Sequence, residues 1–141
     1  VVPLEDALTE DPIQVMFSGD VAAMRRLVAT IAGAAVSARC ALAVTEYESR
    51  DFTLVDVNRA GCTKGATLAG WVAARGLDRS SVMAIGDNFN DLEMLEFAGL
   101  PVVMGNAVPP LKRPGWAVTG SNDEAGVAAA IDRFALRVRG L

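Results

Sequence analysis

The sequence predicts an α/β fold in two parts, a smaller α+β unit over residues 1–60 and a parallel sheet with helices over residues 61–141. In the second part, helical patterns alternate with short, continuous apolar strands, which is typical of parallel strands covered by helices. In the first part, one helical pattern precedes two strands joined by a short polar spacer, which favours antiparallel pairing. A chain of 141 residues suffices for one ordinary domain or for parts of two.

The first part is expected to run strand, helix, strand, strand. Strand-forming residues span 13–17, and residues 18–20 (Ser-Gly-Asp) offer turn and N-cap chemistry. Apolar residues at helical spacing predict a helix over 21–35. Two runs rich in strand formers, 40–47 and 52–57, flank a polar spacer and predict a hairpin.

The second part is expected to alternate helices with short strands. Helices are predicted from the Gly-rich segment 61–65 to about Gly76, over 92–98, and over about 124–136 with Asn122 or Asp123 as N-cap. Apolar strands are predicted at 82–85, 102–104 and 116–118.

The composition excludes several classes of partner. The net charge of −4 without a basic block argues against nucleic acid, and no apolar run reaches the roughly 20 residues of a membrane-spanning helix. The first residues lack the basic and apolar segments of a signal peptide, so we expect a cytoplasmic location. Cys40 and Cys62 lack CxxC spacing and are expected to be reduced residues in or near the core.

The chain contains no histidine. This absence excludes Ser-His and Cys-His nucleophile pairs and the usual zinc sites. Any catalysis must therefore use carboxylates, lysine, hydroxyl groups and a hard cation.

The segment AIGDNFND, residues 84–91, places two carboxylates directly after a predicted strand. In open parallel sheets the ligand crevice lies beyond the carboxyl ends of the strands, so Asp87 is expected to point into it. Asp87, Asn90 and Asp91 together offer the oxygen ligands that magnesium prefers. The alternative interpretation is a polar loop with an Asx cap, since Asp and Asn are ordinary turn residues.

Lys64 lies between Thr63 and Gly65 at the start of a predicted helix. Its ammonium group could neutralise a phosphate or a carboxylate pair. Taken alone, Lys64 is better explained as an ordinary surface lysine.

The order of these motifs resembles the C-terminal half of the haloacid dehalogenase superfamily, most closely its Cof-type class IIB phosphatases. The resemblance covers about residues 56–131 and rests on Lys64-Gly65, the GDNFND segment 86–91, Met94-Leu95, Gly99, the MGNA segment 104–107, the TGSNDE segment 119–124 and Gly126-Val127. It implies an incomplete Rossmann-like core after residue 60, preceded by part of the family's α+β cap.

The resemblance also implies a magnesium-dependent mechanism through a phosphoaspartate, acting on small phosphate monoesters such as sugar phosphates. Lys64 would hold the nucleophile and the transferring phosphoryl group, and Asp87 would be the catalytic magnesium ligand. Asn90 would contact the substrate phosphate, and Asp91 would support the metal shell. A site without histidine suits phosphoryl transfer, which depends mainly on positioning and charge neutralisation.

The family's nucleophile motif, DxDGT, is missing, because no Asp-x-Asp occurs anywhere in the chain. Ser18 precedes the predicted hairpin and is in the wrong order for the family's second motif. We therefore expect a fragment that is inactive alone and that associates as a dimer, or by strand swapping, through the unpaired side of the strand at 82–85. Two alternatives stay open: a non-catalytic fragment that binds a metal or a phosphorylated ligand, and a degenerate scaffold that binds neither.

Overall fold

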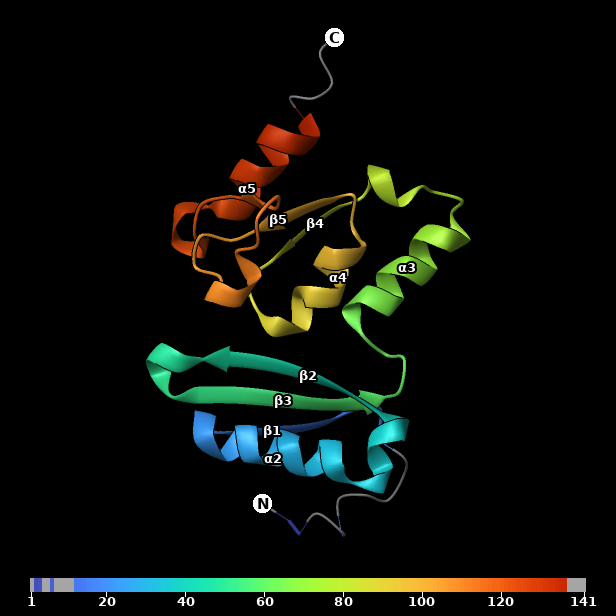
Figure 1. Ribbon diagram of the computed structural model, residues 1–141, viewed down its shortest axis with the longest axis vertical. Coiled ribbons are helices and arrows are strands. Elements are labelled where there is room, and N and C mark those ends of the chain that lie inside the picture. Colours follow the sequence, from blue (N-terminus) through green and yellow to red (C-terminus); the bar gives the residue numbers. More distant parts are fainter. Residues whose placement is uncertain (1, 4–5, 7–11, 137–141) are drawn as a thin grey trace. The chain divides into compact units, whose positions relative to one another are not determined.

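The computed structural model describes residues 2–3, 6 and 12–136 of the chain. It contains two compact units, Val1–Cys62 and Thr63–Leu141, which are treated separately below (Figure 1).

The first unit is a three-stranded antiparallel sheet with a helix on one face (Figure 1). Its elements are β1 (Val15–Gly19), α2 (Val21–Gly33), β2 (Cys40–Tyr47) and β3 (Phe52–Arg59), and the strand order is β1-β3-β2. The predicted hairpin is confirmed, since β2 pairs antiparallel with β3 along its whole length.

The first strand is longer at its C-terminal end than predicted. Ser18 and Gly19 were expected to form a turn, but they pair with Leu54 and Thr53 of β3 and so continue the strand. Only Asp20 acts as expected, because its side chain caps α2 by accepting the backbone N–H of Ala23 at 2.7 Å. Ladder hydrogen bonds with β3 therefore outweigh the turn preference of the Ser-Gly pair.

An ion pair between an exposed arginine and a buried glutamate connects helix α2 to the sheet of the first unit. Glu46 of β2 is only 7% exposed. The guanidinium group of Arg25, on α2, donates to its carboxylate through Nε at 3.1 Å and Nη2 at 2.6 Å. These hydrogen bonds raise the pKa of Arg25 above its ordinary value, chiefly through Glu46, and they satisfy a carboxylate that would be costly to bury alone.

The second unit contains the parallel sheet that the sequence predicts. Its strands follow the order β4-β5-β6, and both neighbouring pairs are parallel. Its main elements are α3 (Lys64–Ala74), β4 (Met83–Gly86), α4 (Leu92–Phe97), β5 (Leu100–Val103), β6 (Ala117–Val118) and α5 (Gly126–Ile131) (Figure 1).

The core of the second unit lies between its sheet and α4. Leu95 of α4 is fully buried, and Leu111 and Val103 pack in the same cluster. Trp116 packs partly buried against this cluster, with the guanidinium group of Arg113 over its ring. Trp116 therefore contributes to packing of the second unit.

Helix α3 ends at Ala74, close to the predicted end at about Gly76, because Gly76 adopts a left-handed conformation with φ of 62° and ends the helical path. One expectation about the cysteines was wrong. Cys62, expected in or near the core, is an exposed free thiol.

The predicted helix over residues 124–136 is divided into shorter pieces. A 3₁₀ turn, Asn122–Glu124, comes first, then α5, and then a π-helical segment, Asp132–Leu136. The cap is Ser121 instead of Asn122 or Asp123, because Ser121 and Glu124 form a reciprocal capping box. Ala125 then adopts a left-handed conformation with φ of 54°, which separates the 3₁₀ turn from α5.

Strand β4 lies at an edge of its sheet in the part of the chain that the structure describes, where it pairs with β5 alone. Over the same residues, no helix combines the length and the apolar character that crossing a membrane requires.

Candidate active site

The candidate site lies at the carboxyl ends of the three parallel strands of the second unit. Asp87 follows β4, Asn106 lies three residues after the end of β5, and the Ser121-Asn122 segment follows β6. Backbone hydrogen bonds bring these loops together: Met104 N–H donates to the carbonyl of Gly86, and Gly105 N–H donates to that of Gly120, each at 3.0 Å. This edge is where ligands bind in open α/β sheets.

Asp91 organises the loop that follows β4. Its Oδ2 accepts the backbone N–H of Asp87 at 3.0 Å and that of Asn88 at 3.3 Å. Asn88 reciprocates by capping the 3₁₀ turn Phe89–Asp91, so the two side chains form a capping box. The segment is therefore an Asx-capped loop, as the alternative interpretation expected. The same loop also carries the two carboxylates of Asp87 and Asp91.

Gly86 allows the Asp91 carboxylate to approach the end of β4. A Cβ atom at position 86 would lie 2.5 Å from Cβ of Asp91 and 2.9 Å from its Oδ2. No side chain larger than hydrogen fits there without moving Asp91, so the glycine is required by close approach.

Lys64 forms an ion pair with Asp91. Its Nζ lies 2.5 Å from Oδ1 of Asp91, and the Asp91 side chain is 7% exposed while that of Lys64 is 51% exposed. The two oxygens of Asp91 thus have different partners: Oδ1 binds the ammonium group, and Oδ2 binds the backbone of the Asp87 loop.

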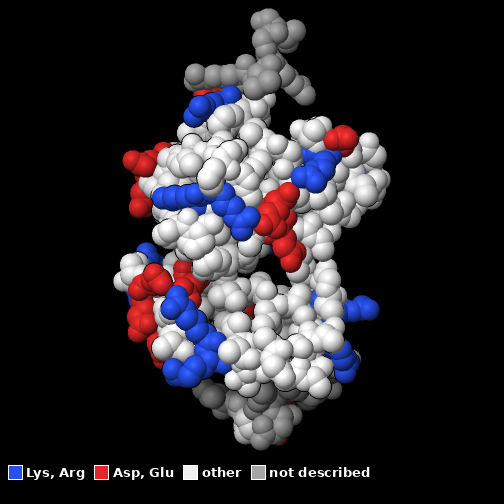
Figure 2. Space-filling view, viewed as in Figure 1, with Lys and Arg blue, Asp and Glu red and all other residues white. Residues whose placement is uncertain are grey.

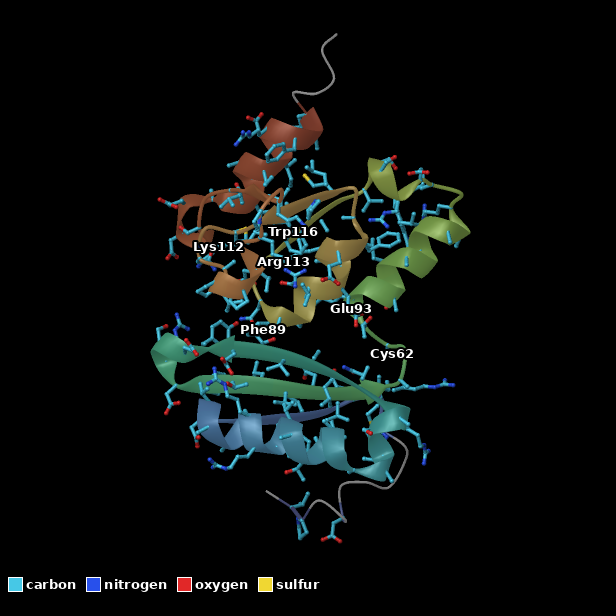
Figure 3. All side chains as sticks on the ribbon, viewed as in Figure 1. Cys62, Phe89, Glu93, Lys112, Arg113 and Trp116 are labelled. Atoms are coloured by element: carbon cyan, nitrogen blue, oxygen red, sulfur yellow. The ribbon has the colours of Figure 1, made fainter. Side chains whose placement is uncertain are left out.

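The start of α3 positions Lys64. Thr63 caps the helix by accepting the N–H of Ala66 at 3.1 Å, and its hydroxyl donates to the carboxylate of Glu93 on α4. The next residue, Gly65, packs closely against α4, where an added Cβ would lie 2.5 Å from Cβ of Glu93. Figure 3 labels Glu93, which lies near the start of α3.

Asp87 is half-buried and is held by a neutral donor. Nδ2 of Asn106 donates to its Oδ2 at 3.1 Å, and the backbone N–H of Asn122 donates to Oδ1 of Asn106 at 2.9 Å. A single amide side chain therefore connects the loops that follow all three strands. Asn90, the fourth predicted site residue, lies half-buried in the same 3₁₀ turn as Asp91.

Sequence reasoning did not place Asn106 or the Ser121-Asn122 segment in the candidate site. The usable signal was their placement: MGNA and TGSNDE each follow a predicted strand, as GDNFND does. Because the carboxyl ends of parallel strands share one edge of the sheet, polar residues after each strand converge.

The donor set consists of oxygen and amide groups, which suits a hard cation such as Mg²⁺. Asp87 is the carboxylate whose partner is neutral, whereas Asp91 already binds Lys64 and two backbone amides. Within the residues that the structure describes, no group of three or more acidic, histidine or cysteine side chains could hold a metal ion.

Charged side chains of both signs are intermixed on the visible surface. Figure 2 shows lysine and arginine close to aspartate and glutamate over both units. Near the candidate site, Arg113 pairs with Glu96 at 2.7 Å, and the Nζ atom of Lys112, labelled in Figure 3, donates to the carbonyl of Gly105 at 2.7 Å. Both basic side chains therefore already have acceptors within the second unit.

Comparisons with known proteins agree on one family. A family profile described as haloacid dehalogenase-like hydrolase matches residues 2–131. The chain is 46% identical over 77 residues to a pyridoxal phosphate phosphatase, YbhA, of Escherichia coli strain K12, a match that covers 55% of this chain and 28% of the relative. It is 42% identical over 84 residues to a 5-amino-6-(5-phospho-D-ribitylamino)uracil phosphatase, YcsE, of Bacillus subtilis strain 168, covering 60% and 34% of the two chains.

Among solved structures, the subclass IIB sugar phosphatase BT4131 matches with a TM-score of 0.74 and 26% identity, over 94% of this chain and 47% of that one. This chain thus spans about a third or less of the length of the two curated relatives and about half of the length of the structural relative. Its resemblance to class IIB phosphatases is confirmed: the chain belongs to the haloacid dehalogenase-like hydrolase family.

Proposed function

We propose that this chain is the C-terminal part of a magnesium-dependent phosphatase whose intact form hydrolyses a small phosphate monoester. The observation that carries this proposal is the network in which Lys64, Asp91 and the Asp87 loop meet at the carboxyl end of β4. The network places a cation and two carboxylates at one edge of the sheet, and phosphoryl transfer depends on such positioned charges.

Each predicted site residue has a role in this proposal. Asp87 would hold Mg²⁺, which when bound neutralises phosphate charge. Lys64 would add positive charge beside the transferring phosphoryl group, and Asn90 would contact the substrate phosphate. Asp91 would support the metal shell by holding the Asp87 loop, because direct coordination through its Oδ1 would compete with Lys64.

This chain alone would not turn over substrate, because it lacks the Asp-x-Asp nucleophile. We assign the unit Val1–Cys62 to part of the cap and Thr63–Leu141 to the second half of the core. The chain spans 47% of the structural relative's chain, which leaves room for a first strand that bears the nucleophile.

The substrate class is inferred from what the relatives share. The three relatives are a pyridoxal phosphate phosphatase, a phosphoribitylaminouracil phosphatase and a sugar phosphatase. A phosphate ester on a small polar organic molecule is common to all three names. We propose this class for the intact protein, with sugar phosphates as the first to test.

We propose association through β4, whose outer side has no partner among the described residues. An unpaired strand edge offers backbone hydrogen bonds to a second copy, giving a dimer or a strand swap. Sedimentation at micromolar concentration should show a dimer; a monodisperse monomer would contradict this. We also propose a cytoplasmic location, consistent with Cys40 and Cys62 as free thiols.

The test compares the chain with its intact gene product. With Mg²⁺ and para-nitrophenyl phosphate, we expect no phosphate release from the chain alone. The upstream reading frame should encode an Asp-x-Asp motif, and the protein extended to include it should release phosphate, with the activity lost in Asp87→Ala. Release by the chain alone that Asp87→Ala abolishes would overturn the proposed inactivity. An upstream frame without the motif would favour the non-catalytic binding fragment.

A further inference from the structure

The side-chain amide of Asn106 bridges the Asp87 carboxylate to the loop after β6. Its Nδ2 donates to Asp87 Oδ2 at 3.1 Å, while its Oδ1 accepts the backbone N–H of Asn122 at 2.9 Å. Asp87 and Asn106 are 19 residues apart, so this contact depends on the parallel arrangement of β4 and β5.

The two partners permit one orientation of the Asn106 amide. A carboxylate oxygen only accepts hydrogen bonds and a backbone N–H only donates them. Rotating the amide by half a turn would place its oxygen against Asp87 and its NH₂ group against the N–H of Asn122, which breaks both hydrogen bonds. The backbone of Asn122 therefore fixes the donor that Asn106 presents to Asp87.

The loop that carries Asn106 is itself anchored. Gly105 N–H donates to the carbonyl of Gly120 at 3.0 Å, and the carbonyl of Gly105 accepts from Nζ of Lys112 at 2.7 Å. An added Cβ at Gly105 would lie 2.9 Å from the backbone nitrogen of Ser121, so the loops after β5 and β6 are packed backbone to backbone. Asn106 thus extends from a fixed support even though its own side chain is exposed.

Charge distinguishes this contact from the one made by Asp91. Lys64 neutralises Asp91, whereas the amide of Asn106 carries no charge and leaves the full negative charge on Asp87. A donor of this kind can orient a carboxylate without reducing its attraction for a cation.

We propose that Asn106 is a positioning residue that holds the Asp87 carboxylate ready for a divalent cation. This inference rests on the proposed role of Asp87 in metal binding. Hydrogen-bonded supports of metal ligands typically change metal affinity by about 10- to 100-fold when removed, so we expect Asn106→Ala to weaken cation binding by at least about 10-fold.

The test measures Mn²⁺ binding to the full 141-residue chain by paramagnetic broadening of its amide NMR signals. Asp87→Asn identifies the signals that depend on the site. Asn122→Ala is the matched control, because it removes an amide side chain from the same region but retains the backbone N–H that binds Asn106. We expect Asn106→Ala to weaken binding at least about 10-fold and Asn122→Ala to change it less than about twofold, with unchanged urea midpoints for both.

The possible outcomes separate the two proposals. If the wild type shows no saturable broadening that Asp87→Asn abolishes, the proposed cation site is wrong and the role of Asn106 fails with it. If the wild type binds Mn²⁺ and Asn106→Ala binds equally well, only the role of Asn106 is wrong. If Asn122→Ala weakens Mn²⁺ binding as much as Asn106→Ala does, the role of Asn106 is also wrong, because the effect would then come from any change in these loops. Asn106→Ser serves as the second variant if Asn106→Ala does not fold.

Discussion

Substituting Gly86 with alanine tests whether close approach of Asp91 to β4 builds the candidate site. The added methyl group would lie 2.5 Å from Cβ, 2.9 Å from Cγ and 2.9 Å from Oδ2 of Asp91. Carbon atoms in contact normally lie about 3.5–4.0 Å apart, so Asp91 must move. Its movement would also strain the hydrogen bonds from Oδ2 to the backbone of Asp87 and Asn88.

The expected cost follows from these two effects. Overpacking typically costs about 1–3 kcal/mol, and weakened hydrogen bonds to a carboxylate add to it. We expect Gly86→Ala to lower the free energy of unfolding by about 2–4 kcal/mol.

Gly70→Ala is the matched control, because Gly70 is an exposed position inside α3 with no heavy atom within 4 Å of an added Cβ. Both substitutions reduce the entropy of the unfolded chain equally, so the difference between them isolates the effect of the folded structure. Alanine in a helix interior is favoured over glycine, and Gly70→Ala should stabilise the chain by about 0.5–1 kcal/mol.

The assay is urea unfolding followed by tryptophan fluorescence. The two tryptophans, Trp71 and Trp116, both belong to the second unit, so their signal reports on the unit that contains the site. A Gly86→Ala variant within about 1 kcal/mol of the wild type would refute the reasoning, since the clash would then be relieved at little cost.

Three further predictions concern the same unit. Leu95→Ala should lower the free energy of unfolding by about 2–5 kcal/mol in the same urea assay, because Leu95 is fully buried; a loss below about 1 kcal/mol would contradict its place in the core. Asp91→Ala should cost about 1–3 kcal/mol and Lys64→Met less than about 1, because Asp91 is buried with three donors while Lys64 is half-exposed; the reverse order would be evidence against this account. The backbone N–H and then the hydroxyl of Ser121 lower the pKa of Glu124, so its stabilising effect is present above the ordinary glutamate pKa and is lost as pH falls through the lowered value; carboxyl ¹³C NMR should show a midpoint below that of free glutamate, and a midpoint at or above it would disprove the capping contribution.

Periodic features of the fold were predictable from the sequence. The hairpin of β2 and β3 followed from two runs of strand formers around a polar spacer, and β2 has the predicted bounds. The parallel sheet followed from the alternation of helices with short apolar strands. Both signals arise from burial, which repeats along the sequence and is therefore visible in it.

Features that depend on a single competing hydrogen bond were not predictable in the same way. Ser18 and Gly19 have turn preferences, yet their pairing with β3 keeps them in the strand. The N-terminal cap at Ser121 was displaced from the predicted Asn122 or Asp123, since several adjacent residues have similar cap preference and only Ser121 has Glu124 three residues later. In each case tertiary or reciprocal contacts decided between local conformations of similar energy.

Some features of the candidate site were predictable from the sequence and others were not. Asp87, Asn90 and Asp91 lie within one short segment, so their proximity could be read from the sequence. The contact between Asn106 and Asp87 depends on the register of β4 and β5 and on the reach of one amide side chain, neither of which the sequence specifies locally.

The charge balance of the site leads to a last prediction. Two carboxylates, Asp87 and Asp91, and one ammonium group, on Lys64, leave one net negative charge for a cation. In water, an ammonium group and a divalent cation about 8 Å apart repel each other by about 1 kcal/mol, so removing the ammonium group should strengthen Mn²⁺ binding to this chain by roughly fivefold. Lys64→Met would thus bind the cation more tightly, whereas in the intact protein the same substitution should abolish phosphate release. Weaker Mn²⁺ binding by Lys64→Met in the NMR titration would mean that Lys64 supports the cation site by holding Asp91, and the electrostatic account of this site would be wrong.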